Sequence, residues 1–187
     1  IPIFKNKNKE EVIAYARKLF EEMRGDFKVE FDDDDANSPG WKFTEWEMMG
    51  VPVRVEAGPK DMESGQVVLV RRDTGEKESV AMEKAAERVR SLLEEIQTSL
   101  YEKALELQKE NTYSYSDYKD FTELFNNKEG GFVDTYWCGS TDCEAEIKEE
   151  TKATIRVLPF EQEIPEGAVC IKCGKPAEHR AIFSKAY

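Results

Sequence analysis

The sequence is poor in the side chains that serve most often as acid–base catalysts and metal ligands, with one histidine and four cysteines among 187 residues. Long apolar runs are missing too, since no stretch approaches the ~20 apolar residues that a membrane-spanning helix requires. The chain does not open on a basic segment followed by an apolar one, which would be typical of a secretory leader. These absences predict a cytoplasmic protein with no membrane partner.

Basic residues are outnumbered, because 27 lysines and arginines face 39 aspartates and glutamates, for a formal net charge of −12. A protein that binds nucleic acid irrespective of sequence needs a broad basic face that neutralises many phosphates. The charge balance argues against that class, but it leaves room for specific recognition through a few local cations. The acidic run at 32–35 is interpreted as a solvated loop rather than a cation site.

Apolar periodicity in the first part of the chain predicts an α/β layer. Apolar residues recur at helical spacing in some segments and alternate with polar residues in others, as in half-buried strands. The expected elements are a strand at 1–4, a helix at 9–24, strands at 27–31, 51–55 and 66–71, and a long helix at 82–109. This β-α-β-β-β-α order predicts a mixed β-sheet flanked by helices, in a domain covering residues 1–109.

A second, smaller α/β domain is expected over residues 110–187, after a polar and aromatic break at 111–116. Its expected elements are helices at 118–125 and 142–150 and strands at 132–137 and 153–158, followed by a loop rich in proline and glutamate and a closing segment at 180–187. All four cysteines of the chain fall in this domain. The domain is therefore the place to look for a metal or redox site.

The cysteines form two close pairs, Cys138 with Cys143 and Cys170 with Cys173, separated by 26 residues. Paired spacing of this kind lets two turns direct four thiolates at one tetrahedral Zn²⁺ ion. A glycine follows one cysteine of each pair and permits the tight turn that points main-chain N–H groups at sulfur. Four thiolates leave no open coordination position, so a zinc ion held in this way would be structural.

Other interpretations of the cysteines stay open. Two disulfides are disfavoured because nothing predicts secretion, and a redox Cys-x-x-Cys would leave Cys138 and Cys143 without a role. A zinc hydrolase or a thiol oxidoreductase would need an open coordination position or a reactive thiolate. The single histidine, His179, lies six residues after Cys173. With four cysteines available, it is interpreted as an exposed residue rather than a ligand.

Several long motifs carry a resemblance to a known family. In the first domain they are SPGWKFTEWE at 38–47, GVPVRVEAGPKD at 50–61 and RRDTGEKE at 71–78. The similarity continues through EEIQTSLYEKAL, WCGSTDCEAEIKEETKATIRVLPF and CIKCGKP to the closing FSKAY, and so covers essentially the whole chain. The chain resembles the anticodon-binding domain and the C-terminal zinc-binding domain of prolyl-tRNA synthetase, the class II enzyme of archaeal and eukaryotic type.

The resemblance implies that four residues read guanines of the anticodon: Glu47, Arg54, Lys60 and Lys77. Proline anticodons share guanines at their second and third positions. A carboxylate can accept from the two N–H donors on the Watson–Crick edge of guanine, and lysine or arginine can donate to its O6 and N7. We expect these residues in strand and turn positions, where each one judged alone would pass for a surface charge.

Other residues have roles that the resemblance suggests. Trp41 and Trp46 are candidates for stacking on anticodon bases, although the acids beside Trp46 favour a half-buried position. The resemblance implies a structural Zn²⁺ ion, because the four cysteines match the family's ligand pattern. The C-terminal tyrosine of the family packs back toward the catalytic domain with its carboxylate near the active site, which assigns that position to Tyr187.

The resemblance also implies what the whole enzyme does. Its catalytic core, which binds ATP with Mg²⁺ and proline, would precede Ile1, so we expect this chain alone to bind tRNA(Pro) without catalysing aminoacylation. The expected partners are the tRNA(Pro) anticodon loop, the catalytic domain of the same polypeptide, and a second subunit in a full-length homodimer. The alternative is a stand-alone tRNA-binding, regulatory or scaffold module derived from a synthetase tail.

Overall fold

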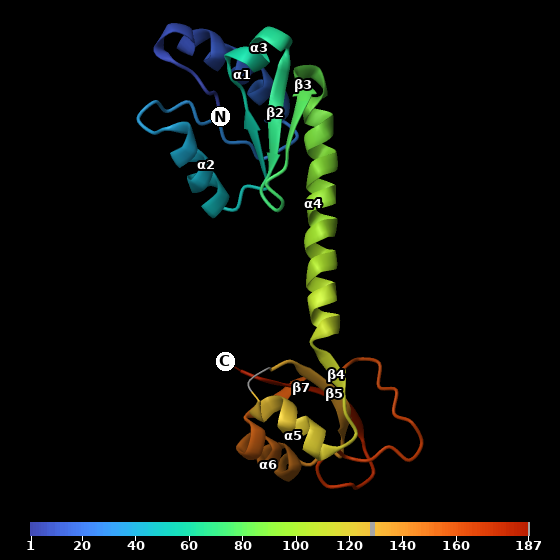
Figure 1. The fold of residues 1–187 in the computed structure, drawn as a ribbon. Helices are drawn as coiled ribbons and strands as arrows, with labels where there is room; N and C mark the ends of the chain where they lie inside the picture. The colour runs from blue at the N-terminus through green and yellow to red at the C-terminus, as the bar shows by residue number, and fades with distance from the viewer. Residues whose placement is uncertain (128–129, 187) are drawn as a thin grey trace. The chain divides into compact units, whose positions relative to one another are not determined.

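The protein is described by a computed structural model that covers residues 1–127 and 130–186. It forms two compact units, Ile1–Lys103 and Ala104–Tyr187, which divide inside helix α4 (Met82–Glu110). Each unit has its own sheet and its own apolar core (Figure 1), which confirms the predicted α/β class.

The predicted domain boundary between residues 109 and 110 stays a proposal. Among the residues described, no helix is long and apolar enough to span a membrane.

The first unit is built on an antiparallel sheet of three strands, β1 (Val53–Glu56), β2 (Gln66–Arg71) and β3 (Lys77–Ala81), with β2 in the centre. A 3₁₀ turn at Asn6–Asn8 leads into helix α1 (Lys9–Met23). Because alternate residues of a strand point to the same face, one face of β2 joins α1 and α4 in a common core. The core residues are Ala16, Leu19, Met23, Ala57, Val67, Leu69, Ala85, Val89 and Leu92.

Two short helices complete the first unit, and the sequence patterns predict neither. Helix α2 (Pro39–Met48) begins after Ser38, whose hydroxyl accepts a hydrogen bond from the main-chain N–H of Trp41 at 3.3 Å. Helix α3 (Pro59–Ser64) ends at Gly65, which takes the left-handed φ of 67° that favours glycine. Both helices open on a proline at their first position. In the sequence, these prolines and glycines mark loops instead.

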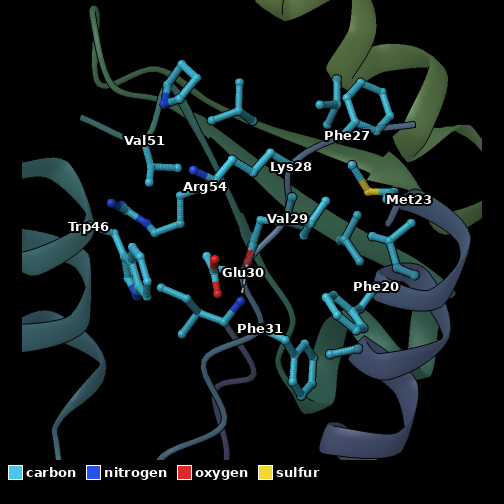
Figure 2. A pocket seen from close by; sticks show the side chains of 18 of the residues that line it. Phe20, Met23, Phe27, Lys28, Val29, Glu30, Phe31, Trp46, Val51 and Arg54 are labelled. Carbon is cyan, nitrogen blue, oxygen red and sulfur yellow. Dashed lines mark hydrogen bonds between the residues drawn. The ribbon is translucent and has the colours of Figure 1, made fainter. Parts of the chain in front are cut away.

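Two predicted strands of the first unit are wrong as strands. Residues 27–31 have no regular secondary structure and are not part of the described sheet, although half-buried and exposed side chains alternate along them (Figure 2). At the start of the chain, pairing is limited to one parallel bridge between Pro2 and Ala57. The parallel pairing expected of a mixed sheet is therefore confined to that bridge. Alternation predicts an extended backbone, whereas a strand also needs a neighbour that supplies hydrogen-bond partners.

The second unit contains a mixed sheet in the order β4-β5-β7-β6. The short strand β4 (Thr112–Ser114), which the sequence patterns miss, lies parallel to β5 (Phe132–Trp137). Strand β7 (His179–Lys185) is antiparallel to both β5 and β6 (Ala153–Val157). Helices α5 (Tyr118–Asn126) and α6 (Thr141–Thr151) pack against this sheet (Figure 1). Their shared core includes Phe121, Phe125, Val133, Ile147, Ala181 and Phe183.

Candidate nucleic-acid interface and candidate metal centre

Charged side chains from three elements meet on the face of the first sheet that does not carry the α1–α4 core. Arg54 of β1 and Lys77 of β3 both pair with Val70 of the central strand. Residues that pair directly across antiparallel strands point to the same face of the sheet. Arg54 and Lys77 are therefore neighbours across β2, although 22 residues separate them in the chain.

Glu56 lies at the centre of this charged cluster. Its side chain is 9% exposed, and its carboxylate accepts hydrogen bonds from Arg54 Nε at 3.0 Å and from Lys77 Nζ at 3.3 and 3.4 Å. Arg54 Nη1 donates to Glu47 Oε1 of α2 at 2.6 Å. The guanidinium of Arg54 is thus held between two carboxylates, which fixes its plane.

Phe43 of α2 supports both cations of the cluster. Its ring centroid is 4.1 Å from the guanidinium carbon of Arg54 and 5.9 Å from Lys77 Nζ, within the range of about 6 Å for cation–π attraction. Phe43 and Glu47 lie four residues apart on α2, so one helix face presents both. Phe43 and Glu56 were not predicted as members of this cluster. Because Arg54 and Glu56 lie two residues apart on β1, the period of a strand places both on one face.

Exposure differs among the four predicted guanine readers. The side chains of Glu47 and Lys77 are 49% and 54% exposed, whereas that of Arg54 is 10% exposed. Lys60 is exposed on the first turn of α3 and does not belong to the ion-paired cluster. The prediction of strand and turn positions is correct for Arg54 and wrong for Glu47 and Lys60. Lys77 is the first residue of a strand rather than part of a turn. These positions were predicted wrongly because prolines and glycines next to short helices and strand starts are typical of turns.

Helix α2 is held in place by a polar anchor. The ammonium of Lys42, which is 3% exposed, lies 2.8 Å from Asp32 Oδ1, and Trp46 Nε1 donates to Asp32 Oδ2 at 2.8 Å. Burial alone would raise the pKa of Asp32, but the hydrogen bonds from Lys42 and Trp46 outweigh it and lower the pKa. Trp46 is half-buried, as predicted, and Trp41 is 52% exposed. The acidic run at 32–35 has no regular secondary structure, as expected of a loop. Its first residue, Asp32, is however half-buried and anchors α2.

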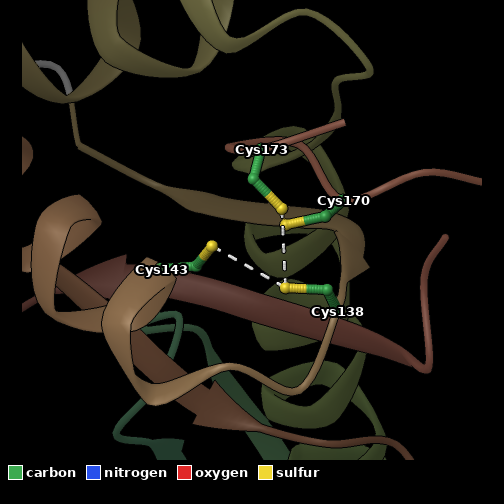
Figure 3. Close-up of side chains that lie close together, drawn as sticks. All are labelled: Cys138, Cys143, Cys170 and Cys173. Carbon is green, nitrogen blue, oxygen red and sulfur yellow. Dashed lines mark hydrogen bonds between the residues drawn. The ribbon is translucent and has the colours of Figure 1, made fainter. Parts of the chain in front are cut away.

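In the second unit, the sulfur atoms of the four cysteines lie within 4.8 Å of one another (Figure 3). Cys138 Sγ is 3.7 Å from the sulfur atoms of both Cys143 and Cys173. A tetrahedral site with metal–sulfur bonds of about 2.3 Å has sulfur–sulfur edges of about 3.8 Å, so these separations suit one metal ion. Disulfide bonds of about 2.05 Å are excluded at such distances, and all four thiols are free.

The turns around the cysteines are shaped for metal binding. Gly139 and Gly174 have φ values of 79° and 69°, which residues with a Cβ atom rarely adopt. The main-chain N–H of Lys175 donates to the sulfur of Cys173 and lowers the pKa of that thiol to about 7. Burial raises the pKa of Cys143 to about 12. A bound cation would compensate for four thiolates gathered at this boundary of the core.

The remaining predicted residues lie elsewhere. His179 is half-buried, with its ring centroid 5.6 Å from that of Trp137, so the expectation of an exposed histidine is wrong. Strand β7 begins at His179, and the pairing of this residue with Trp137 of β5 covers one side of the ring. His179 is not among the clustered ligand atoms. Tyr187 lies outside the described residues.

Comparison with known proteins identifies relatives along the whole chain. An anticodon-binding domain model matches residues 1–92, and a model described as "Prolyl-tRNA synthetase, C-terminal" matches residues 118–187. The proline–tRNA ligase of Natranaerobius thermophilus is 42% identical over 100% of this chain and 38% of its own length. That of Rubrobacter xylanophilus is 48% identical over 100% and 38%, respectively. Proline–tRNA ligase 2 of Bacillus cereus is 46% identical over 97% and 37%.

The chain therefore spans about 38% of the length of the curated relatives it matches. The two domain models occupy separate parts of the chain and agree in order with the two compact units of the structure. The chain belongs to the prolyl-tRNA synthetase family, which it matches over the anticodon-binding domain and the C-terminal domain.

Proposed function

We propose that this chain is the tRNA-recognition portion of a proline–tRNA ligase and that it reads the guanines of the proline anticodon. The observation that carries the proposal is the convergence of Glu47, Arg54 and Lys77, from three separate elements, around one buried carboxylate and one aromatic ring. Unrelated surface charges would not share such a scaffold. Lys60, exposed on α3, is proposed as a fourth contact from outside the cluster.

The donor and acceptor pattern of the cluster complements guanine. One oxygen of Glu47 pairs with Arg54, and its second oxygen would accept from N1–H or N2–H of the base. The Arg54 guanidinium offers five donors in a fixed plane, of which Glu56 and Glu47 orient two. Lys77 is half exposed on a flexible stem, so its ammonium could reach O6 or N7.

The charge balance of the cluster suits base readout better than phosphate binding. Glu47 and Glu56 together cancel the charges of Arg54 and Lys77. With a chain net charge of −12, few phosphates would be neutralised, and the affinity should depend only weakly on salt. Specificity would come from hydrogen bonds to unstacked bases.

We also propose that the metal is Zn²⁺ and that its role is structural. The residues that would hold it are Cys138, Cys143, Cys170 and Cys173, a set of four thiolates that closes a tetrahedral shell. Cys143 and Cys170 belong to the core of the second unit. The ion would tie the start of α6 to the turn at 170–173, which adds constraint that a small core needs.

The properties of the whole enzyme are proposals that rest on the family. They are ATP-dependent charging of tRNA(Pro) with proline, ATP and Mg²⁺ in a catalytic domain of the same polypeptide, a full-length homodimer, and a cytoplasmic location. On this view, Tyr187 extends toward that catalytic domain. A regulatory or scaffold role without anticodon reading is the alternative outcome of the binding experiment below.

The test compares anticodon stem-loops that carry either both guanines of the proline anticodon or adenines in their place. We expect the natural loop to bind at least tenfold more tightly, because a good bidentate base contact discriminates by about 1–3 kcal/mol. Arg54→Lys should remove most of this discrimination, since lysine lacks the planar fork. The matched control is Arg90→Lys, at an arginine that is 57% exposed and pairs with Asp26, and it should change nothing.

Two results would contradict the proposal. One is equal affinity of the unmodified chain for both loops. The other is full discrimination retained in both Arg54→Lys and Glu47→Gln, which would place readout elsewhere. Circular dichroism of each variant separates lost recognition from lost folding.

A further inference from the structure

The turn at 170–173, which carries two of the four cysteines, is held unevenly by the core. Its first residues are buried, since Cys170 is 1% exposed and Ile171 is 6% exposed. The main-chain N–H of Ile171 also donates to the carbonyl of Tyr136 in β5 at 3.0 Å. Cys173, at the other end of the turn, is exposed, although its sulfur lies 3.7 Å from that of Cys138 (Figure 3). The core therefore fixes Cys170 directly and Cys173 only through the turn.

Lys172 lies between these two cysteines and connects the turn to helix α6. Its side chain is 14% exposed, and its Nζ atom lies 2.6 Å from Glu150 Oε1 and 3.6 Å from Glu146 Oε2. Glu146 and Glu150 are four residues apart and share one face of α6. Cys143, three residues before Glu146, lies on the same face. Helix α6 therefore meets the turn at two points, which are the thiol cluster and the ammonium of Lys172.

Helix α5 contributes a third contact to Lys172. The Nζ atom lies 4.4 Å from the ring centroid of Tyr118, the first residue of α5, within the range of about 6 Å for cation–π attraction. The hydroxyl of Tyr118 donates to Glu150 Oε2 at 2.7 Å. Glu150 thus accepts from Lys172 with one oxygen and from Tyr118 with the other. Because each of the three side chains contacts the other two, the ammonium has little freedom to move.

The charges around Lys172 indicate a role in positioning rather than in charge compensation. Glu146 and Glu150 together outweigh its single positive charge, so the ammonium is not available to offset the charge of the thiolates. Exposed ion pairs hold a side chain weakly, but this one is largely buried and its partners belong to two helices. Groups that orient a metal ligand without touching the metal typically change its affinity by about 10–100-fold.

We propose that Lys172 positions Cys173 for the metal ion by attaching the turn at 170–173 to α5 and α6. The proposal rests on the proposed Zn²⁺ site and is independent of RNA binding. Without the contacts of Lys172, Cys170 should keep its place in the core. Cys173 should move toward solvent and bind the ion less tightly.

The first experiment measures Zn²⁺ affinity by competition with a chromophoric chelator, in the unmodified chain and in Lys172→Met and Lys172→Arg. Methionine keeps an apolar stem without the charge, and we expect the affinity to fall at least tenfold. Arginine can form both the ion pairs and the cation–π contact, so it should recover most of the loss. The matched control is Lys119→Met, because Lys119 also pairs with a glutamate, Glu123, at 3.7 Å but is 79% exposed. This control should bind Zn²⁺ as the unmodified chain does.

A second experiment separates positioning of one ligand from a general loss of stability. Alkylation of the zinc-loaded chain by iodoacetamide, mapped by mass spectrometry, should become at least tenfold faster at Cys173 in Lys172→Met. The thiols of Cys138, Cys143 and Cys170 should stay protected. Adding Tyr118→Leu to Lys172→Met should lower the affinity no further, because both side chains act through the same contacts.

Unchanged Zn²⁺ affinity together with unchanged alkylation of Cys173 in Lys172→Met would overturn the proposal. Equally faster alkylation of all four cysteines would overturn it too, because it would show that Lys172 stabilises the whole unit instead of one ligand. Failure of the unmodified chain to bind Zn²⁺ would be a different result, since it would contradict the proposed metal site and this inference with it.

Discussion

Replacing Glu56 by glutamine tests the charged cluster most directly. The substitution keeps the shape of the side chain and removes the charge that Arg54 Nε and Lys77 Nζ contact at 3.0 Å and 3.3 Å. The side chains of Glu56 and Arg54 are 9% and 10% exposed, so their ion pair is largely desolvated. Glu47, which is half exposed, would be the remaining carboxylate partner of Arg54.

The expected cost follows from this burial. Removing one partner of a fully buried ion pair destabilises a protein by about 3–5 kcal/mol, whereas loss of an exposed pair costs about 0–1 kcal/mol. Arg54 keeps a second carboxylate, and Lys77 is 54% exposed, so solvent would compensate part of the loss. We expect a destabilisation of about 1–2 kcal/mol for Glu56→Gln, with weaker discrimination between the two stem-loops because the cations lose their orientation.

The assay is urea unfolding, monitored by hydrogen exchange in peptides of β1 to β3. The matched control is Glu95→Gln, because Glu95 also accepts from two arginines, Arg71 and Arg88, but its side chain is 44% exposed. We expect the control to cost less than about 0.5 kcal/mol. Equal losses of stability in the two variants would refute the reasoning that the burial of Glu56 makes its ion pairs more stabilising than those of Glu95.

Two further predictions concern the metal and the anchor of α2. Chelation of the metal under reducing conditions should expose four thiols to a titrating reagent and speed exchange in the second unit, because Cys143 and Cys170 lie in its core. Unchanged exchange in that unit would contradict a structural ion. For Asp32, the folded-state pKa lies below its ordinary 3.8, so its stabilisation is complete above that value and is lost as the pH falls through the lower folded pKa. In urea unfolding of the first unit, Asp32→Asn should therefore lower stability at pH 7 and flatten the decline below about pH 4, and a profile of unchanged slope in the variant would rule this out.

Local patterns predict the long helices and most paired strands well. Helix α4, with a broad apolar face, and strand β5 are found close to or at their expected bounds. The patterns fail for α2 and α3, where prolines and glycines that read as loops begin and end short helices. They also fail for residues 27–31. Half-buried and exposed side chains alternate there as in a strand, but no strand among the described residues pairs with this segment.

The candidate sites divide in the same way. The spacing of the four cysteines was enough to predict one cluster, and the sulfur atoms lie within 4.8 Å of one another. The resemblance to the family pointed to Glu47, Arg54, Lys60 and Lys77, but no local pattern indicates which of them meet. Glu56 and Phe43 were missed because the sequence does not show which carboxylates are buried or which aromatic rings lie against a cation.

By itself, the sequence determined the class of the fold, the family and the thiol cluster, because periodicity, long motifs and cysteine spacing are local properties of the chain. Only the tertiary structure decided that Arg54 and Lys77 share Glu56, since strand register brings together residues far apart in the chain. It also decided that Lys60, on α3, stays outside the cluster. Pairing and burial depend on what each element packs against, and that information is not contained in any short stretch of sequence.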